Sequence, residues 1–536
     1  MVAMQKIKQI IEEGNISIGI EFGSTRIKSV LIDSKGNILA KGEFEWENHL
    51  IDGIWTYPQE EIWQGLQGAY ASLSESVKKQ YNVVIRQAKA IGISGMMHGY
   101  MPFDKEGNQL TFFRTWRNNI TSKSSEKLTA LFQYNIPQRW SISHLYQAVL
   151  NKEEHVPNID FLTTLAGYIH WKLTDEKVLG IGEASGMFPI DIQLLDFNQK
   201  MLDQFDRLIS ELDYPWTIRH ILPKVARAGE YAGVLTESGA KLIDPSGGLQ
   251  AGIPLCPPEG DAGTGMVATN SIQEKSGNIS AGTSAFAMIV LEKELSRVYE
   301  QLDMVTTPSG KLVAMAHANN CTSDINAWVS LFGECLATFG VNVSQSKLYE
   351  TLFIKALEGE NDCGNLLAYG FYSGEHGVGL NEGCPMFLHP MKANFNLANF
   401  IRVHLYTAFG AMKLGMDILL QREQVKIQQI LAHGGIFKTK GIAQKILASA
   451  LNVPIAVTES ATEGGAWGIA LLANYLSYKH KSLETYLDED IFSSCNKEIV
   501  YPDSEMVLGY NAFIKRYSQG LSIVQEAINT KILTIS

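Results

Sequence analysis

The chain lacks the features that define several large classes of protein. Its 536 residues contain no uninterrupted apolar run of about 18 residues, so we expect no membrane-spanning helix. The formal net charge is −11 and the basic residues form no stripe, which argues against a nucleic-acid-binding scaffold. The opening stretch MVAMQKIKQIIEEGN has no apolar core of the kind found in signal peptides.

Cysteine is scarce and dispersed. The six cysteines, at positions 256, 321, 335, 363, 384 and 495, include no CxxC pair. Scattered thiols of this kind are typical of a reducing compartment and not of a disulfide or zinc framework. His376, His389 and His404 also have no metal-binding spacing. We therefore expect a cytoplasmic protein without a zinc site.

The composition is that of a globular protein, with 45% hydrophobic and 19% charged residues. The chain is too long for one ordinary core, so we expect two domains of roughly 200–270 residues each.

Two stretches share one pattern of strand, glycine, two hydroxyl residues and strand. In the first, residues 16–22, 27–33 and 38–44 predict an antiparallel meander, with Gly23-Ser24-Thr25 at the first turn. In the second, residues 277–291 turn at Gly282-Thr283-Ser284. Such turns can hold a phosphate through backbone N–H groups and hydroxyls, although each is also compatible with a plain hairpin. Their repetition indicates a duplicated architecture, with a sheet and a turn at the start of each half.

Two charged residues flank the first turn. Glu21, at the end of a predicted strand, could hold a magnesium ion through water, or be an exposed strand acid. Lys28 could offset phosphate charge, or simply be solvated.

An acid surrounded by glycines follows a Pro-Pro turn in PPEGDAGTG, at the end of the turn-rich stretch 244–265. We expect Asp261 to lie on a sharp turn, outside any regular helix or strand, with its carboxylate free. Phosphoryl transfer to an alcohol requires a base that accepts the hydroxyl proton, and an aspartate suits this role. The alternative is that Asp261 caps the following segment.

A buried strand is predicted at residues 88–95, and it leads into Met96-Met97-His98-Gly99. A polar ring beside flexible apolar side chains suits a small polyol with one apolar face, so Met97 and His98 are candidate sugar ligands. His98 could also be a hydrogen-bonded core histidine. Trp116-Arg117-Asn118-Asn119 adds aromatic and amide groups that could contact hydroxyls, Trp116 above all.

A further strand, 428–435, runs into Gly434-Gly435 and is followed by Lys438 and a helix at 441–451. Paired glycines there make a flat surface for a nucleotide base or ribose, although such pairs are common in strand-to-helix turns. Further helices are predicted at residues 58–80, 161–173, 397–421, 463–476 and 505–528.

Taken in order, these stretches resemble the FGGY carbohydrate kinases of the sugar-kinase/Hsp70/actin superfamily, over roughly residues 16–480. GIEFGSTRIKSVLID is similar to the first phosphate loop, and GNISAGTSAF is similar to the second. The segment from Leu222 to PPEGDAGTG resembles the approach to the catalytic aspartate, which is Asp261 here. LAHGGIFKTKGIAQKILASALNVPI, with EGGAWGIALLA, resembles the adenosine-binding region.

The resemblance implies an α/β protein with two RNase H-like, actin-like ATPase domains that close on a central cleft. Residues 1–274 would form the sugar-binding domain and residues 275–536 the domain that holds most of the ATP. It also implies a mechanism in which Asp261 deprotonates a terminal hydroxyl that attacks the γ-phosphoryl of Mg²⁺-ATP. The expected residues fall into three groups: sugar contacts Met97, His98, Trp116 and Asp261; ATP contacts Gly23, Ser24, Thr25, Lys28, Gly282, Thr283, Ser284, Gly434, Gly435 and Lys438; and the metal contact Glu21.

Within the family, SGMMHGYMPFD resembles the Met-His-Gly pattern of xylulokinases, whereas glycerol kinases carry an Arg-Glu pair at Met97-His98. D-xylulose is therefore the first expected substrate. The chain departs from the family at two places. Glu21 replaces the usual Asp, which implies a reshaped metal shell, and Trp116-Arg117-Asn118-Asn119 stands near the Asn-Asp pair of xylulokinases, which leaves the exact sugar open. The alternatives are another ketose or alditol, such as ribulose, fuculose or a glycerol-like acceptor, and a non-catalytic sugar sensor or ATPase. A homodimer is compatible with such kinases.

Overall fold

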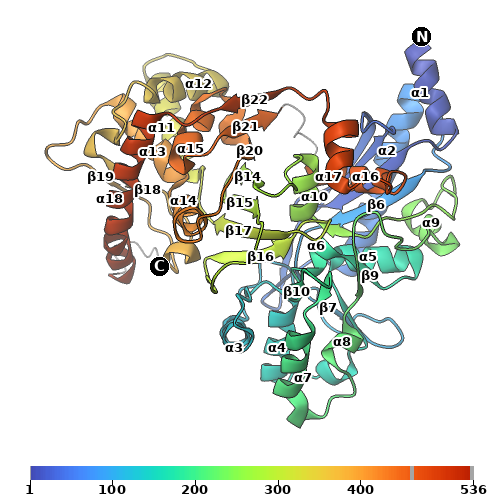
Figure 1. The fold of residues 1–536 in the computed structure, drawn as a ribbon. Helices are drawn as coiled ribbons and strands as arrows, with labels where there is room; N and C mark the ends of the chain where they lie inside the picture. Colours follow the sequence, from blue (N-terminus) through green and yellow to red (C-terminus); the bar gives the residue numbers. More distant parts are fainter. Residues whose placement is uncertain (1, 459–463, 531–536) are drawn as a thin grey trace. The chain divides into compact units, whose positions relative to one another are not determined.

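The chain forms two compact units in a computed structural model that describes residues 2–458 and 464–530 (Figure 1). The first unit consists of Met1–Ile272, Met304–Val313 and Ser460–Ser494, and the second of Gln273–Asp303, Ala314–Glu459 and Cys495–Ser536. The domain boundary expected between residues 274 and 275 stays a prediction. In addition, two later segments, Met304–Val313 and Ser460–Ser494, belong to the same unit as the N-terminal part of the chain.

The first unit is built on a five-stranded sheet in the order β13-β6-β1-β2-β3. Its strands are β1 Ser17–Phe22, β2 Arg26–Ile32, β3 Ile38–Glu45, β6 Ala90–Gly95 and β13 Glu259–Gly260. β1, β2 and β3 form the predicted antiparallel meander, and β1 pairs in parallel with β6. The sequence patterns are thus confirmed for these strands.

Two helices cover opposite faces of this sheet. On one face, Ser29 Oγ of β2 donates a hydrogen bond to the carbonyl of Ala69 (2.7 Å) in α2, Gln59–Tyr81. On the other face, a Cβ built on Gly19 would lie 2.2 Å from the carbonyl oxygen of Ala466 in α16, Gly464–Tyr475. Only glycine permits this approach, so α16 packs directly on the backbone of β1.

The second unit contains a seven-stranded sheet in the order β16-β17-β15-β14-β20-β21-β22. The strands are β14 Ser276–Ala281, β15 Ala285–Val290, β16 Leu302–Thr306, β17 Leu312–Ala318, β20 Gln429–His433, β21 Ile455–Thr458 and β22 Lys497–Val500. β14 is antiparallel to β15 and parallel to β20, as β1 is to β2 and β6. The two units therefore repeat one local topology, as the matched turns predict.

The helices follow the predicted segments with two differences. The main helices of the second unit are α11 Ser323–Thr338, α12 Gln345–Ala356, α13 Leu397–Ala408, α14 Gly410–Asp417, α15 Ile442–Leu451 and α18 Ser504–Asn529. The single helix predicted over 397–421 is interrupted at Phe409, next to Gly410, whose Cα packs against the ring of Tyr517. The helix predicted over 161–173 begins only with α5, Leu165–Thr174, because Phe161–Thr163 forms strand β8.

Among the described residues, no helix combines the length and the hydropathy needed to cross a bilayer. All six cysteines lie in the described part of the chain and are free thiols.

Candidate active site

The first turn, between β1 and β2, is held from behind by two aromatic residues. Trp46 Nε1 donates to the carbonyl of Gly23 (2.7 Å), and the Tyr57 hydroxyl donates to the carbonyl of Ser24 (2.6 Å). The two rings stack with centroids 4.1 Å apart. In a trans peptide the C=O and the following N–H point in opposite directions, so the N–H groups of Ser24 and Thr25 point away from these rings. Adjacent N–H groups with this orientation can bind an anion.

Glu21 lies beside this turn and caps a helix. Its Oε2 accepts the backbone N–H of Ala466 (3.2 Å) in the first turn of α16, and the β1–β2 register places it opposite Lys28. A Cβ on Gly465 would lie 2.1 Å from Glu21 Oε1.

The described residues contain no group of three or more His, Cys, Asp or Glu side chains suited to a metal ion. A metal held at Glu21 would therefore take most of its ligands from water and phosphate oxygens, as Mg²⁺ commonly does. The metal role of Glu21 stays a prediction.

Asp261 is the first residue of helix α10, Asp261–Ala268, with Gly260 as its N-cap. The expectation that it lies outside regular structure, with a free carboxylate, is therefore wrong. Its Oδ1 accepts the backbone N–H of Met97 (3.1 Å). Burial raises the pKa of Asp261, while the N–H groups of Met97 and Ala262 oppose the rise.

Met97 and His98 lie just beyond the end of β6 and are both buried. His98 has a positive φ of 73°, which is strained for a non-glycine residue and common at functional sites. Its Nδ1 lies 3.2 Å from the carbonyl oxygen of Gly186. A carbonyl only accepts, so Nδ1 carries the proton in this hydrogen bond.

The structure brings Met97, His98 and Asp261 together. Trp116, in contrast to the buried Met97 and His98, is 40% exposed. The loop around it is anchored by Asn118, whose side chain accepts the Trp55 N–H (2.9 Å) and donates to the Trp55 carbonyl (2.8 Å). The role of Trp116 as a sugar ligand stays a prediction.

The second turn, in the other unit, is also held by its carbonyl groups. Thr322 Oγ1 donates to the carbonyl of Gly282 (2.8 Å), and the Cys321 N–H donates to the carbonyl of Thr283 (2.8 Å). The N–H groups of Thr283 and Ser284 consequently point away from these partners.

The paired glycines Gly434 and Gly435 follow β20 and lie next to this turn. β14 and β20 align Ser280 with His433, and a Cβ on Gly434 would lie 2.0 Å from the carbonyl oxygen of Ala281. Gly434 and Gly435 are exposed, as is Lys438 at the end of the short helix Gly435–Lys438. The structure thus brings the predicted ATP residues of this unit to one end of the sheet.

The sequence patterns did not single out two buried acids near Asp261. Glu259 and Glu183 are 1% and 0% exposed. Each is a lone acid within an apolar or small-residue run, in PLCPPEG and LGIGEASGMF, and that pattern was the available signal.

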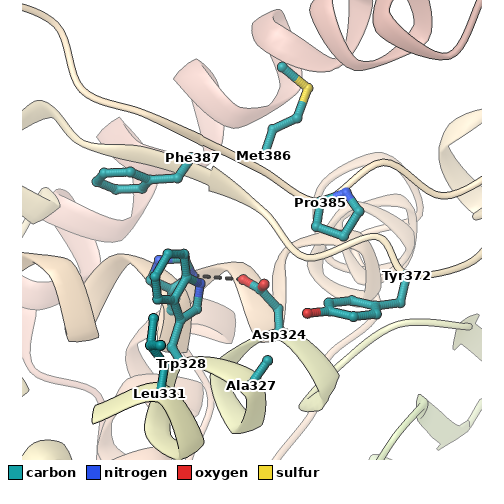
Figure 2. A pocket seen from close by; sticks show the side chains of 9 residues that line it. Asp324, Ala327, Trp328, Leu331, Tyr372, Pro385, Met386 and Phe387 are labelled. Atoms are coloured by element: carbon teal, nitrogen blue, oxygen red, sulfur yellow. Dashed lines mark hydrogen bonds and ion pairs between the residues drawn. The ribbon is translucent and has the colours of Figure 1, made fainter. Parts of the chain in front are cut away.

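A separate cavity of about 270 Å³ lies within the second unit and is lined mostly by aromatic and apolar residues (Figure 2). In this view Asp324 lies between Trp328 and Tyr372. Asp324 Oδ2 is 2.8 Å from His404 Nδ1, which fixes the acid at the wall of the cavity. None of the predicted site residues lines it.

Comparison with known families identifies the chain. Residues 16–268 match the N-terminal domain, and residues 277–477 the C-terminal domain, of the FGGY family of carbohydrate kinases. The chain belongs to this family. It is therefore a sugar phosphotransferase of the ATP-using kinase type, with the two-domain actin-like ATPase fold.

Two named relatives match this chain to different extents. It is 24% identical to the xylulose kinase of Haemophilus influenzae over 94% of this chain and 99% of that protein. It is 22% identical to the glycerol kinase of Thermococcus kodakarensis over 52% of this chain and 55% of that protein.

Solved structures show the same fold. The ligand-bound xylulose kinase of Lactobacillus acidophilus matches with a TM-score of 0.78 and 15% identity, covering 95% of this chain and 98% of that one. The gluconate kinase of the same organism matches with a TM-score of 0.77 and 16% identity, covering 94% and 96%. Kinases named for different substrates thus share this fold, so the fold does not select the sugar.

Proposed function

We propose that this FGGY carbohydrate kinase phosphorylates the terminal hydroxyl of a small ketose, with D-xylulose as the first candidate. The observation that carries the proposal is the 3.1 Å hydrogen bond from the Met97 N–H to Asp261 Oδ1. This hydrogen bond joins a carboxylate of raised pKa to Met97, next to His98, and both residues are buried. A buried acid beside an apolar side chain and an imidazole supports the proposal of a site for one small polyol.

Asp261 is assigned as the base. Its carboxylate accepts the hydroxyl proton as the sugar oxygen bonds to the γ-phosphorus and the bond from that phosphorus to the ADP oxygen breaks. The residues of the first turn, Gly23, Ser24 and Thr25, with Lys28, are assigned to phosphate oxygens. The residues of the second turn, Gly282, Thr283 and Ser284, have the same role, and Gly434, Gly435 and Lys438 are assigned to the nucleoside side.

Bound Mg²⁺ would neutralise part of the phosphate charge, with Glu21 as its protein contact through water. A cytoplasmic location is proposed from the six free thiols, which persist in reducing compartments. A homodimer is compatible with this scheme.

D-xylulose is preferred because the full-length relative from Haemophilus influenzae is named a xylulose kinase, while the glycerol kinase of Thermococcus kodakarensis matches over about half of this chain. The Trp116-Arg117-Asn118-Asn119 segment differs from the xylulokinase pattern, so other ketoses and alditols belong in the test.

The test is ADP release from Mg²⁺-ATP with a panel of D-xylulose, D- and L-ribulose, L-fuculose, glycerol, common alditols and gluconate. The wild type is run beside Asp261→Asn. We expect stimulation by one ketose and a loss of about 10³-fold in kcat in the variant, with ATP binding retained. Stimulation by glycerol or gluconate alone would overturn the ketose assignment, and an active Asp261→Asn would overturn the base assignment.

A further inference from the structure

Glu259 connects the strand before Asp261 to a short helix on another segment. It lies in β13, and its two carboxylate oxygens accept the backbone N–H groups of Gly182 (3.2 Å) and Glu183 (2.9 Å). These two residues belong to α6, Ile181–Ala184. One buried side chain therefore ties α6 to the segment that carries Asp261.

Glu183 fills the space between these segments. A Cβ built on Gly260 would lie 2.2 Å from Glu183 Oε2, so the carboxyl lies directly against the residue that precedes Asp261. Thr164 and the backbone N–H of His98 lie near it, but neither carboxyl oxygen has a hydrogen-bond partner among the described residues. Glu183 thus contacts both segments that carry the proposed chemistry.

The residues after α6 complete the connection to His98. The Gly186 carbonyl accepts the His98 Nδ1 proton (3.2 Å), and a Cβ at Gly186 would lie 2.6 Å from that nitrogen. The Met97 N–H in turn donates to Asp261. Hydrogen bonds therefore link three segments in a closed set: 97–98, 182–186 and 259–261.

We propose that Glu259 and Glu183 are positioning residues that hold the sugar ligand His98 and the base Asp261 at a fixed spacing. Glu259 acts through its two backbone acceptor bonds, and Glu183 through its packed carboxyl group. This inference rests on the proposed function, because it assigns a purpose to the spacing that sugar phosphorylation needs.

The charges in this cluster agree with the assignment. Burial, with the charges of Asp261 and Glu259, raises the pKa of Glu183 well above its ordinary value. Burial also raises the pKa of Glu259 to about 8, while N–H donors from Gly182 and Glu183 favour its carboxylate. Burial, with a smaller contribution from the charge of Glu259, raises the pKa of the Cys256 thiol. Glu183 therefore holds its proton more tightly than an exposed glutamate does, and glutamine mimics the protonated form.

Four variants test the inference: Glu259→Gln, Glu183→Gln, Glu183→Ala and the exposed control Glu154→Gln. The assays are run at about pH 9, above the raised pKa of Glu259 of about 8, so that the wild type carries the carboxylate. The Glu259→Gln amide turns an NH₂ group toward one backbone N–H, so one bond is lost. We expect kcat/KM for the stimulating sugar to fall about 10²-fold, which is the order of loss from a small misplacement of reacting groups. The Kd for ATP should stay within about twofold, as for Glu154→Gln.

Glu183→Gln should keep kcat/KM within about threefold, whereas Glu183→Ala should lose as much as Glu259→Gln. Equal losses in Glu183→Gln and Glu183→Ala would overturn the role of the packed Glu183 side chain. A Glu259→Gln enzyme that unfolds at lower temperature but keeps the kcat/KM of its folded fraction would overturn the positioning role.

A second measurement separates this inference from the proposed function. The ¹⁵N spectrum of the histidine rings, with the His98 signal assigned by His98→Gln, reports its Nδ1–H tautomer without any sugar. Glu259→Gln should shift that signal and Glu154→Gln should not. If no sugar is phosphorylated, the proposed function fails, while an unshifted His98 signal still rejects the positioning inference.

Discussion

Glu21 on β1 accepts a hydrogen bond from the backbone N–H of Ala466, a residue 445 positions later, across 3.2 Å. The bond fixes the N-terminal end of α16 beside the first turn. A carboxylate at a helix N-terminus satisfies an otherwise unpaired N–H and complements the helix dipole. One side chain thus connects the proposed phosphate turn to the helix that covers the sheet.

Glu21→Ala should lower the free energy of unfolding of the first unit by about 1 kcal/mol, the usual value of a lost helix cap. Glu21→Gln keeps an acceptor oxygen and should lose much less. Thermal unfolding without ligands measures both, with the exposed Glu47→Ala as control. Equal stability of wild type and Glu21→Ala would contradict the capping role.

The same pair of variants tests the metal assignment. Because Glu21→Gln keeps the cap but removes the charge, a rise in the Mg²⁺ concentration for half-maximal activity would come from the metal and not from folding. An unchanged Mg²⁺ requirement would remove Glu21 from the metal site.

Local patterns predicted the hairpins of both units, because alternating apolar residues and a Gly-Ser-Thr or Gly-Thr-Ser turn specify a strand pair without distant contacts. The pairing of α16 with the first unit could not be predicted in this way. It depends on contacts such as Gly19 against Ala466, which join opposite ends of the sequence.

The helix at Asp261 was missed for a related reason. The run GDAGTG contains three glycines, which disfavour a helix in isolation. In the folded chain α10 packs closely on α16, since a Cβ on Gly468 of α16 would lie 2.0 Å from the Thr264 carbonyl oxygen. Tertiary packing overrides the local preference here. The sequence nevertheless predicted Asp261 as a candidate base. Glu259 was missed, because a lone acid in an apolar run does not by itself indicate a role.

Activity should depend on the protonation of Asp261 at a higher pH than for an exposed aspartate. Burial raises its pKa above the ordinary value of 3.8, and only the carboxylate accepts the hydroxyl proton. The acidic limb of kcat/KM should therefore have a midpoint above that value and rise with pH. A pH–rate profile measures it, and a limb at or below the ordinary value would contradict the buried setting of the base.

Stability should fall as pH rises through neutrality because of Glu259. Its pKa is raised from 4.5 to about 8, so the native state binds a proton that the unfolded chain has lost in this window. Its contribution is complete below the lower value and is lost as pH passes the upper one. Glu183 and Asp261, with raised pKa values, act in the same direction.

Urea unfolding from about pH 7 to about pH 8 measures this slope, and Glu259→Gln should reduce it by at most roughly 1.4 kcal/mol per pH unit. Buried His144 and His170 and half-buried His155 do not interfere, because desolvation lowers their pKa values from 6.5 and they titrate below this window. An identical slope in Glu259→Gln would show that this side chain does not titrate there.

Gly434 and Gly435 offer a matched test of the second unit. Gly434 has a φ of 122° and faces the Ala281 carbonyl, whereas a Cβ on Gly435 meets nothing within 4 Å. Gly434→Ala should cost roughly 1–3 kcal/mol through backbone strain, and more through the clash, while Gly435→Ala should be nearly neutral for stability. Because Gly434 abuts the second turn, its replacement should also raise the KM for ATP more than the KM for sugar. Unfolding midpoints and the KM values for ATP and sugar measure these effects. Equal stability of the two alanine variants would exclude a strained backbone requirement at Gly434. An effect on the sugar KM alone would remove this turn from the ATP site.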